Sequence, residues 1–280
     1  MSDRVAVEGG ELEYEVWGTG EPVLLIHGSH LADALTPLLA QPALTEQYRL
    51  IHYHRRGFAG SCRHAEPCGM SQQAADARSL LDHLGIERAH VVGHSYGGAI
   101  ALQLAPDAPE RVASLALLEP AGIAVASGEV FFMQEVLAPA GERYARGDKA
   151  GAVEPFLQGV CGPQMREVAD RVLPPGAYDL EVADADTFFL TEGPALGEWQ
   201  FGPNEGACIE QPVLLMRGTD SDAVTPMFGE MNAALAKWLP RAESVTLPGA
   251  THALQMMNPD GTAALLADFF ARYPVATAVG

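Results

Sequence analysis

Short apolar runs recur along the chain, and stretches with helical spacing of apolar residues lie between them. Runs such as Val23-Leu24-Leu25-Ile26 are hydrophobic at every position, which is the pattern of a parallel β-strand covered by helices on both faces. The predicted strands are 23–26, 48–53, 90–92, 112–118, 212–216 and 244–247, and the predicted helices are 71–84, 99–104, 227–239 and 262–273. This alternation predicts an α/β fold with a mostly parallel sheet.

The first segment follows a different pattern, in which apolar and acidic side chains alternate. Within residues 5–17 one face carries Leu12, Tyr14 and Val16, and the other carries Glu11, Glu13 and Glu15. Such alternation is typical of half-exposed strands, and Gly9-Gly10 supplies a turn between them. We therefore expect an antiparallel strand pair at the open edge of the sheet.

From residue 121 to 207 the alternation of strands and helices is lost, and helical patches rich in aromatic residues appear. We expect a helical cap inserted after the sixth strand, so that residues 1–120 and 208–280 form the core domain and residues 121–207 form the cap. Most of the aromatic residues would fill the cap, and some would line a largely apolar pocket. The last part of this segment is acidic and is expected to be a solvated face; its acidic residues are Asp179, Glu181, Asp184, Asp186, Glu192, Glu198 and Glu205.

The charged residues limit the kinds of molecule that the protein is expected to bind. Seventeen Lys and Arg against 36 Asp and Glu give a net charge of −19, which repels phosphate backbones and anionic lipids. A small-molecule substrate is therefore expected, with no nucleic acid and no membrane as partner. The N-terminus lacks a signal-like pattern and no apolar run approaches about 18 residues, so we expect a cytoplasmic protein. The four cysteines show no metal-type spacing, and neither a metal nor a cofactor is predicted.

The stretch from Ala89 to Ile100 carries the strongest chemical signal. It reads Ala-His-Val-Val-Gly-His-Ser-Tyr-Gly-Gly-Ala-Ile, a Gly-x-Ser-x-Gly motif between a buried strand and the start of a helix. A nucleophile held above a sheet needs a turn so tight that neighbouring side chains would collide, and Gly93 and Gly97 relieve that crowding. The pattern predicts that Ser95 is a nucleophile.

With this motif the sequence resembles the α/β-hydrolases, from the Leu24-Leu25-Ile26-His27-Gly28 stretch to the Gly249-Ala250-Thr251-His252 stretch. The resemblance implies a mostly parallel eight-stranded sheet flanked by helices, with triad residues in the order Ser, acid, His. His252 falls in the loop between the last strand and the last helix, where the general base of this family lies. The resemblance also implies an oxyanion hole formed by the backbone N–H groups of Ser29 and Tyr96.

The third triad member is left open between three carboxylates. Relatives usually carry an Asp three residues after the Gly of the loop that begins at Arg217-Gly218, but Ser221 occupies that place. Asp222 and Asp220 lie on either side of it. Some relatives carry the acid just after the sixth strand, where Glu119 lies, and we prefer Glu119, with Asp222 as the alternative acid. The Arg-Gly loop at 54–61 also departs from the family pattern, with His54 in place of an Asp, and is expected to be structural.

These residues predict a serine hydrolase that cleaves a small or medium apolar ester, thioester or lactone through an acyl-enzyme, without a cofactor. The alternatives are a hydrolase of C–C bonds in β-diketone-like substrates, a cofactor-free perhydrolase, and a ligand-binding member of the fold without catalysis. The oligomeric state is unknown from the sequence.

Overall fold

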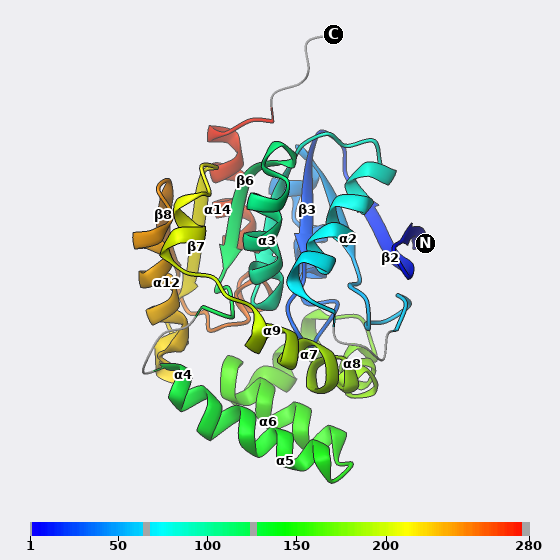
Figure 1. The fold of residues 1–280 in the computed structure, drawn as a ribbon, viewed down its shortest axis with the longest axis vertical. Coiled ribbons are helices and arrows are strands. Elements are labelled where there is room, and N and C mark those ends of the chain that lie inside the picture. The colour runs from blue at the N-terminus through cyan, green and yellow to red at the C-terminus, as the bar shows by residue number, and fades with distance from the viewer. Residues whose placement is uncertain (1, 64–67, 124–127, 276–280) are drawn as a thin grey trace.

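The computed structural model describes residues 2–63, 68–123 and 128–275, and its centre is one eight-stranded sheet (Figure 1). The strand order is β1-β2-β4-β3-β5-β6-β7-β8. From β4 to β8 in that order every pairing is parallel, whereas β1, β2 and β4 pair antiparallel. The strands are β1 Asp3–Val7, β2 Gly10–Trp17, β3 Glu21–Ile26, β4 Tyr48–Tyr53, β5 Ala89–His94, β6 Val112–Leu118, β7 Val213–Gly218 and β8 Ala242–Leu247. The predicted eight-stranded, mostly parallel sheet is confirmed.

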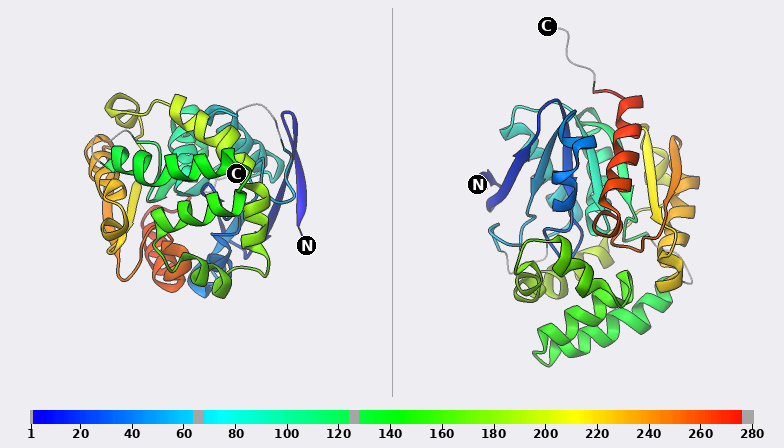
Figure 2. Two further views of the ribbon diagram at one scale, coloured as in Figure 1. Left: turned by 90° about the horizontal axis from the view of Figure 1, so that it is seen from below. Right: turned by 180° about the vertical axis from the view of Figure 1, so that it is seen from behind.

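Helices cover both faces of the sheet (Figures 1 and 2). One face carries α2 (Met70–His83), α3 (Tyr96–Asp107) and α12 (Met227–Trp238), and the other carries η1 (Thr36–Ala40), α1 (Pro42–Thr45) and α14 (Pro259–Arg272). Shorter elements are η2 (Pro109–Arg111), α11 (Ser221–Val224) and α13 (Leu254–Met257). No helix in the described ranges has the length and apolar character needed to cross a bilayer.

The apolar runs are explained by these two layers. In β3, Leu24 and Ile26 pack in the core under α2 and α3, whereas Val23 and Leu25 pack in the core under α14. Successive side chains of a strand point to opposite faces, so a strand covered on both sides must be apolar at every position.

The antiparallel edge forms as expected, with Val5 opposite Leu12 and a turn in which Gly9 has a φ of 80°. Leu12 and Tyr14 are buried, but Val16 is 38% exposed, because the sheet face at the end of β2 is not covered. Two helices differ in their bounds from the sequence-based expectation. α2 begins at Met70, one residue before the predicted start, and α3 extends beyond both ends of the predicted range 99–104.

Between β6 and β7 the chain forms only helices over the described residues 128–207, which we call the insertion. They are α4 Gly128–Phe131, η3 Phe132–Leu137, α5 Ala138–Ala145, α6 Lys149–Cys161, α7 Met165–Val172, α8 Ala177–Asp186, η4 Thr187–Glu192, α9 Gly193–Glu198 and α10 Pro203–Ala207. Most of them lie beyond the carboxyl ends of the parallel strands (Figure 1). The division of the chain into a core domain and a separate cap domain stays a prediction.

Candidate active site

Ser95 lies at the tight turn between β5 and α3. Its φ of 53° and ψ of −119° place a non-glycine residue in a strained backbone conformation. Strain of about 1–3 kcal/mol at one residue persists only where the surrounding structure imposes it, and such residues cluster at functional sites. The hydroxyl is thereby carried at the end of the strand, at the wall of a cavity.

The glycines around Ser95 allow this turn because the backbone segments touch. A Cβ atom on Gly93 would lie 2.5 Å from the carbonyl oxygen of Gly97, and one on Gly97 would lie 2.1 Å from the carbonyl oxygen of Ile26. Both distances are far below a van der Waals contact. On the other side, a Cβ atom on Gly28 would lie 2.9 Å from Cβ of Ser95. The backbone of the loop after β3 therefore passes so close to Ser95 that a side chain at position 28 would not fit.

His252 and Glu119 come from the loops after β8 and β6 and contact each other. Nδ1 of His252 lies 2.9 Å from Oε2 of Glu119, and the carboxylate is fully buried. The His252 ring is stacked on Phe228 with ring centroids 3.8 Å apart. A carboxylate at Nδ1 holds the ring in the tautomer whose Nε2 can accept a proton. His252 and Ser95 line the same cavity.

The other two candidate acids lie away from His252. Asp222 forms an ion pair with Arg217 at the surface, and Asp220 accepts a hydrogen bond from Thr219 at 3.0 Å. Ser221 donates its hydroxyl to Oε1 of Glu119 at 2.5 Å, and the backbone N–H of Gly218 donates to the same oxygen at 2.9 Å. The serine at the family's usual Asp position thus binds Glu119.

His94 contributes a support that the sequence did not reveal. Its ring lies 4.7 Å from the His252 ring, and its Nε2 lies 2.8 Å from the His252 carbonyl oxygen. Burial and the proximity of the His252 ring lower the pKa of His94 to about 3. His94 is therefore neutral, and its Nε2–H donates to the His252 carbonyl oxygen. This hydrogen bond holds the loop that carries His252.

Arg55 orients the loop between β3 and Ser29. This buried side chain donates from Nε to the His27 carbonyl at 2.9 Å and from Nη2 to the Gly28 carbonyl at 2.8 Å. In a trans peptide the C=O and the following N–H point in opposite directions. Because Arg55 holds the Gly28 carbonyl, the N–H of Ser29 points away from Arg55.

The N–H of Tyr96 is the second predicted oxyanion donor. Tyr96 is the first residue of α3, and N–H groups in the first turn of a helix have no intrahelical partner. The partial positive charge at this helix end also favours an anion. Ser29 and Tyr96 both line the cavity together with Ser95.

The expected solvated face of the insertion holds for only part of its acidic residues. Asp179, Asp186, Glu198 and Glu205 are exposed, but the other three acidic residues are not. Glu181, Asp184 and Glu192 are 2–3% exposed. Glu192 forms a buried ion pair with Arg55, and its other oxygen accepts from the Ser29 hydroxyl at 2.6 Å. Glu181 and Glu192 bind residues 29–31 of the loop after β3, which line the cavity, so they attach the insertion to its edge.

We expect Arg55→Met to lower the free energy of unfolding by about 3–5 kcal/mol, because it leaves the Glu192 carboxylate buried without its partner. Urea denaturation measures this loss. The double variant Arg55→Met/Glu192→Gln should regain part of it. As a control, Arg146→Met removes a surface ion pair with Glu142 and should cost less than about 0.5 kcal/mol. An equal, small loss in both single variants would contradict the role of Arg55.

The cavity beside Ser95 has a volume of about 310 Å³ and a mostly apolar lining. Its aromatic residues come from the insertion, from α12 and from the start of α3. Phe132 and Phe188 line it, whereas Phe131 points outward and is 40% exposed. The aromatic lining residues are Tyr96, Phe132, Phe156, Phe188, Trp199 and Phe228.

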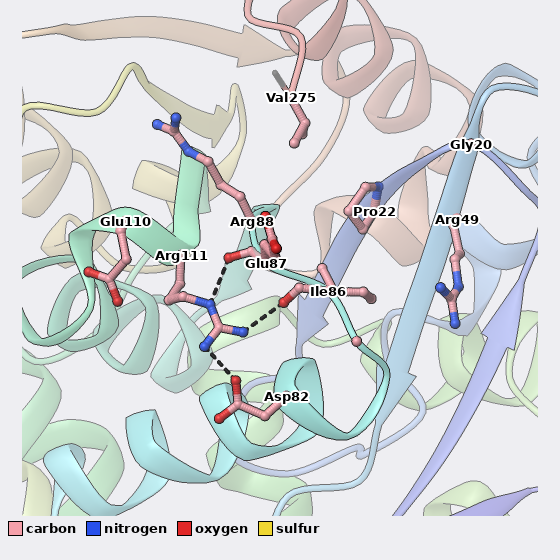
Figure 3. Close-up of a pocket in the computed structure, with 11 residues that line it drawn as sticks. Gly20, Pro22, Arg49, Asp82, Ile86, Glu87, Arg88, Glu110, Arg111 and Val275 are labelled. Carbon is pink, nitrogen blue, oxygen red and sulfur yellow. Dashed lines mark hydrogen bonds and ion pairs between the residues drawn. The ribbon is translucent and has the colours of Figure 1, made fainter. Parts of the chain in front are cut away.

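A larger hollow of about 990 Å³ lies at the amino ends of the parallel strands, and Figure 3 shows its lining residues. Ser95 follows the carboxyl end of β5, so it lies at the opposite end of the sheet. Arg111 is held there by Asp82 at 2.5 Å and by the carbonyl groups of Ile86 and Glu87. Its described lining contains no serine, cysteine or histidine. We therefore place no chemistry in it.

A second serine–histidine–glutamate arrangement lies at this end of the sheet. Nδ1 of His90 is 2.7 Å from the Ser114 hydroxyl, and Nε2 is 3.3 Å from Glu21. Ser114 is fully buried within β6, so no substrate can reach it. We therefore assign no catalytic role to this arrangement.

Asp33, His52 and His54 form a group whose possible ligand atoms lie within 4.8 Å of one another. Both nitrogens of His54 already contact carboxylates, Nδ1 with Glu13 at 2.9 Å and Nε2 with Asp33 at 3.0 Å. Burial opposes the charge on His54, but the bonds to Asp33 and Glu13 raise its pKa. The raised pKa favours the charged form of this ring, which lies between two acidic side chains. The structural role of the loop stays a prediction.

Comparisons with known proteins agree with this architecture. The family model for the alpha/beta hydrolase fold matches residues 21–259. A dihydrolipoyllysine-residue acetyltransferase component of an acetoin cleaving system from Pseudomonas putida is 31% identical over 252 residues, which is 87% of this chain and 62% of that protein. The chain thus spans less than two thirds of that relative.

Two further proteins are similar over nearly their whole length. A non-heme haloperoxidase from Rhodococcus erythropolis is 29% identical, over 94% of this chain and 97% of the relative. The crystal structure of the enol-lactonase from Burkholderia xenovorans LB400 superposes with a TM-score of 0.80 at 24% identity, covering 96% of this chain and all of that one. The last comparison concerns the fold alone.

Proposed function

Because the chain belongs to the alpha/beta hydrolase fold family, whose model matches residues 21–259, we propose that it is a serine hydrolase. Its substrate is a small or medium apolar carboxylic ester, thioester or lactone. One observation carries the proposal: the buried Glu119 holds His252 in a cavity whose wall also carries the strained Ser95.

In the proposed reaction His252 Nε2 takes the proton from the Ser95 hydroxyl as Oγ attacks the substrate carbonyl carbon. The N–H groups of Ser29 and Tyr96 stabilise the resulting oxyanion. The tetrahedral intermediate collapses, the C–O or C–S bond breaks, and the leaving group takes the proton from His252. Water, activated by His252, then hydrolyses the acyl-enzyme and restores Ser95. Glu119 stays ionised and stabilises the imidazolium.

The size and lining of the cavity support the substrate class. A volume of about 310 Å³ fits the lower end of the range for small-molecule sites, and the apolar lining favours hydrocarbon parts of a ligand. Hydrolysis of p-nitrophenyl acetate, butyrate and octanoate tests the proposal. We expect release of p-nitrophenol that Ser95→Ala abolishes. Activity that survives in Ser95→Ala would refute the proposal, and so would its absence from the wild-type protein with all three esters.

We expect Phe132→Ala to change the preference between acyl chains, because Phe132 lines the cavity. A methylene in an apolar pocket changes kcat/KM by at least about tenfold, so the octanoate-to-butyrate ratio should rise by about that factor. Phe131→Ala is the matched control, since the neighbouring side chain lies outside the cavity lining. Equal ratios in the two variants would place the acyl chain elsewhere.

One relative favours a second candidate activity. The Rhodococcus erythropolis protein is named a non-heme haloperoxidase, and an acyl-enzyme attacked by hydrogen peroxide instead of water would release a peracid. Bromination of monochlorodimedone in the presence of bromide, acetate and hydrogen peroxide tests this perhydrolase reaction, because the peracid would oxidise the bromide. The reaction should also require Ser95. A C–C bond hydrolase would instead cleave β-diketones faster than esters, and a ligand-binding protein would turn over neither.

A further inference from the structure

His30 is a buried histidine in the cavity wall that the proposed reaction does not use. It follows Ser29 in the loop after β3, and its ring packs against Phe156 and Phe188 with centroid distances of 4.8 and 4.6 Å. The residue is 2% exposed and lines the cavity beside Ser95. A polar ring is thus placed among apolar side chains of the insertion.

One nitrogen of this ring is bound and the other is not. Nδ1 contacts the buried Glu181 carboxylate, whose second oxygen accepts the backbone N–H of Leu31. Within the described residues Nε2 has no hydrogen-bond partner. A buried polar atom without a partner is costly, and most buried polar atoms in native proteins have one. A bound ligand that supplied the missing partner would account for this atom.

The backbone gives a second sign that the position of His30 is imposed. His30 and Leu31 have φ values of 61° and 46°, a left-handed conformation that is unfavourable for side chains with a Cβ. The Glu181 carboxylate binds both residues of this turn. One oxygen contacts the His30 ring, and the other accepts the backbone N–H of Leu31. The strained turn is therefore fixed from the insertion, and it keeps the ring in the cavity wall.

The strand order places His30 and His252 on opposite sides of Ser95. Ser95 follows β5, His30 follows β3 on one side of it, and His252 follows β8 on the other. The leaving group must take its proton from His252, so it lies on the His252 side. The acyl part of the substrate then extends toward His30.

We propose that Nε2 of His30 binds a hydroxyl group on the acyl part of the substrate, so that the enzyme prefers hydroxyacyl esters over plain acyl esters. A hydroxyl fits because it both donates and accepts, and it can pair with Nε2 as a lone pair or as an N–H. A carboxylate would add a charge beside Glu181 and Glu192, which are already buried. This inference rests on the proposed function, since it assumes that Ser95 carries the acyl group.

The test compares p-nitrophenyl butyrate with the 2-hydroxy and 3-hydroxybutyrate esters, in wild-type protein and in His30→Phe. The quantity of interest is the ratio of kcat/KM for hydroxy ester to plain ester, and comparing this ratio between proteins removes the intrinsic reactivity of each ester. At one of the two positions the ratio should fall by about tenfold or more in His30→Phe. His30→Gln, whose amide can reach a similar place, should retain part of the preference. Unchanged ratios at both positions in a folded His30→Phe protein would overturn the proposal.

A binding experiment separates this inference from the proposed function. Calorimetric titration of Ser95→Ala with butyrate, 2-hydroxybutyrate and 3-hydroxybutyrate needs no turnover. A hydroxy acid should bind about tenfold more tightly than butyrate, and Ser95→Ala/His30→Phe should lose that difference. Equal affinities for all three acids would refute the role of His30 even if Ser95 proves to be the nucleophile. A preference for the hydroxy acid in a protein without esterase activity would support the hydroxyl site and refute only the hydrolase.

Discussion

Replacing His252 with alanine is expected to lower kcat for p-nitrophenyl butyrate by a factor on the order of 10⁶, about as much as Ser95→Ala. The Ser95 hydroxyl is a weak nucleophile without a base, and we assign that role to His252, which the buried Glu119 carboxylate orients through Nδ1. The double variant should lose little more, because members of one catalytic unit do not act additively. Steady-state kinetics on folded variants measures these losses.

The exposed His83 in α2 provides the matched control. His83→Ala should keep the wild-type kcat, since its ring lies against Tyr14, away from the cavity. If His252→Ala retained most of kcat, another histidine would be the base. His30 and His94 also line the cavity and would be substituted next.

Glu119→Gln should lower kcat by a factor on the order of 10⁴. The glutamine would keep the shape of the side chain, but its amide could present N–H to Nδ1 of His252 and favour the wrong tautomer. The bonds from Ser221 and Gly218 hold Oε1 in place, so they would direct the amide nitrogen toward His252. The loss should appear in kcat more than in KM, because the carboxylate does not touch the substrate.

Asp222→Asn and Asp220→Asn are the controls for this prediction. Both carboxylates lie in the loop after β7, where many relatives carry the acid, but neither contacts His252 in the structure. We expect each variant to lose less than about threefold in kcat. A crippled Asp222→Asn beside an active Glu119→Gln would move the acid to that loop.

Much of the fold could be predicted because its strands are buried on both faces. A run such as residues 23–26 has no polar side chain, so neither of its faces can be exposed to solvent. In the Gly-x-Ser-x-Gly motif the glycines are needed because neighbouring backbone segments leave no room for a Cβ atom. The preference for Glu119 rests on the resemblance to relatives that carry the acid after the sixth strand, and on Ser221 at the usual Asp position. The apolar strand alone leaves Glu119 either exposed or held by a partner.

The supports of the site could not be predicted, because their partners lie far apart in the chain. Glu192 and Arg55 are separated by 137 residues, and Glu181 and His30 by 151. The sequence shows the acidic residues of the insertion but not the side chains that bind them, such as Arg55 and His30. A solvated face is therefore the expectation for this segment. Ser221 illustrates the same limit: its position suggested a missing acid, whereas in the structure its hydroxyl binds Glu119.

The most direct test of the nucleophile is covalent labelling. Wild-type protein treated with a fluorophosphonate should gain the mass of one phosphonyl group, and peptide mapping should place the adduct on Ser95. The folded Ser95→Ala protein should gain none. An adduct of equal yield in Ser95→Ala, or an adduct on another residue of the wild-type protein, would contradict the account.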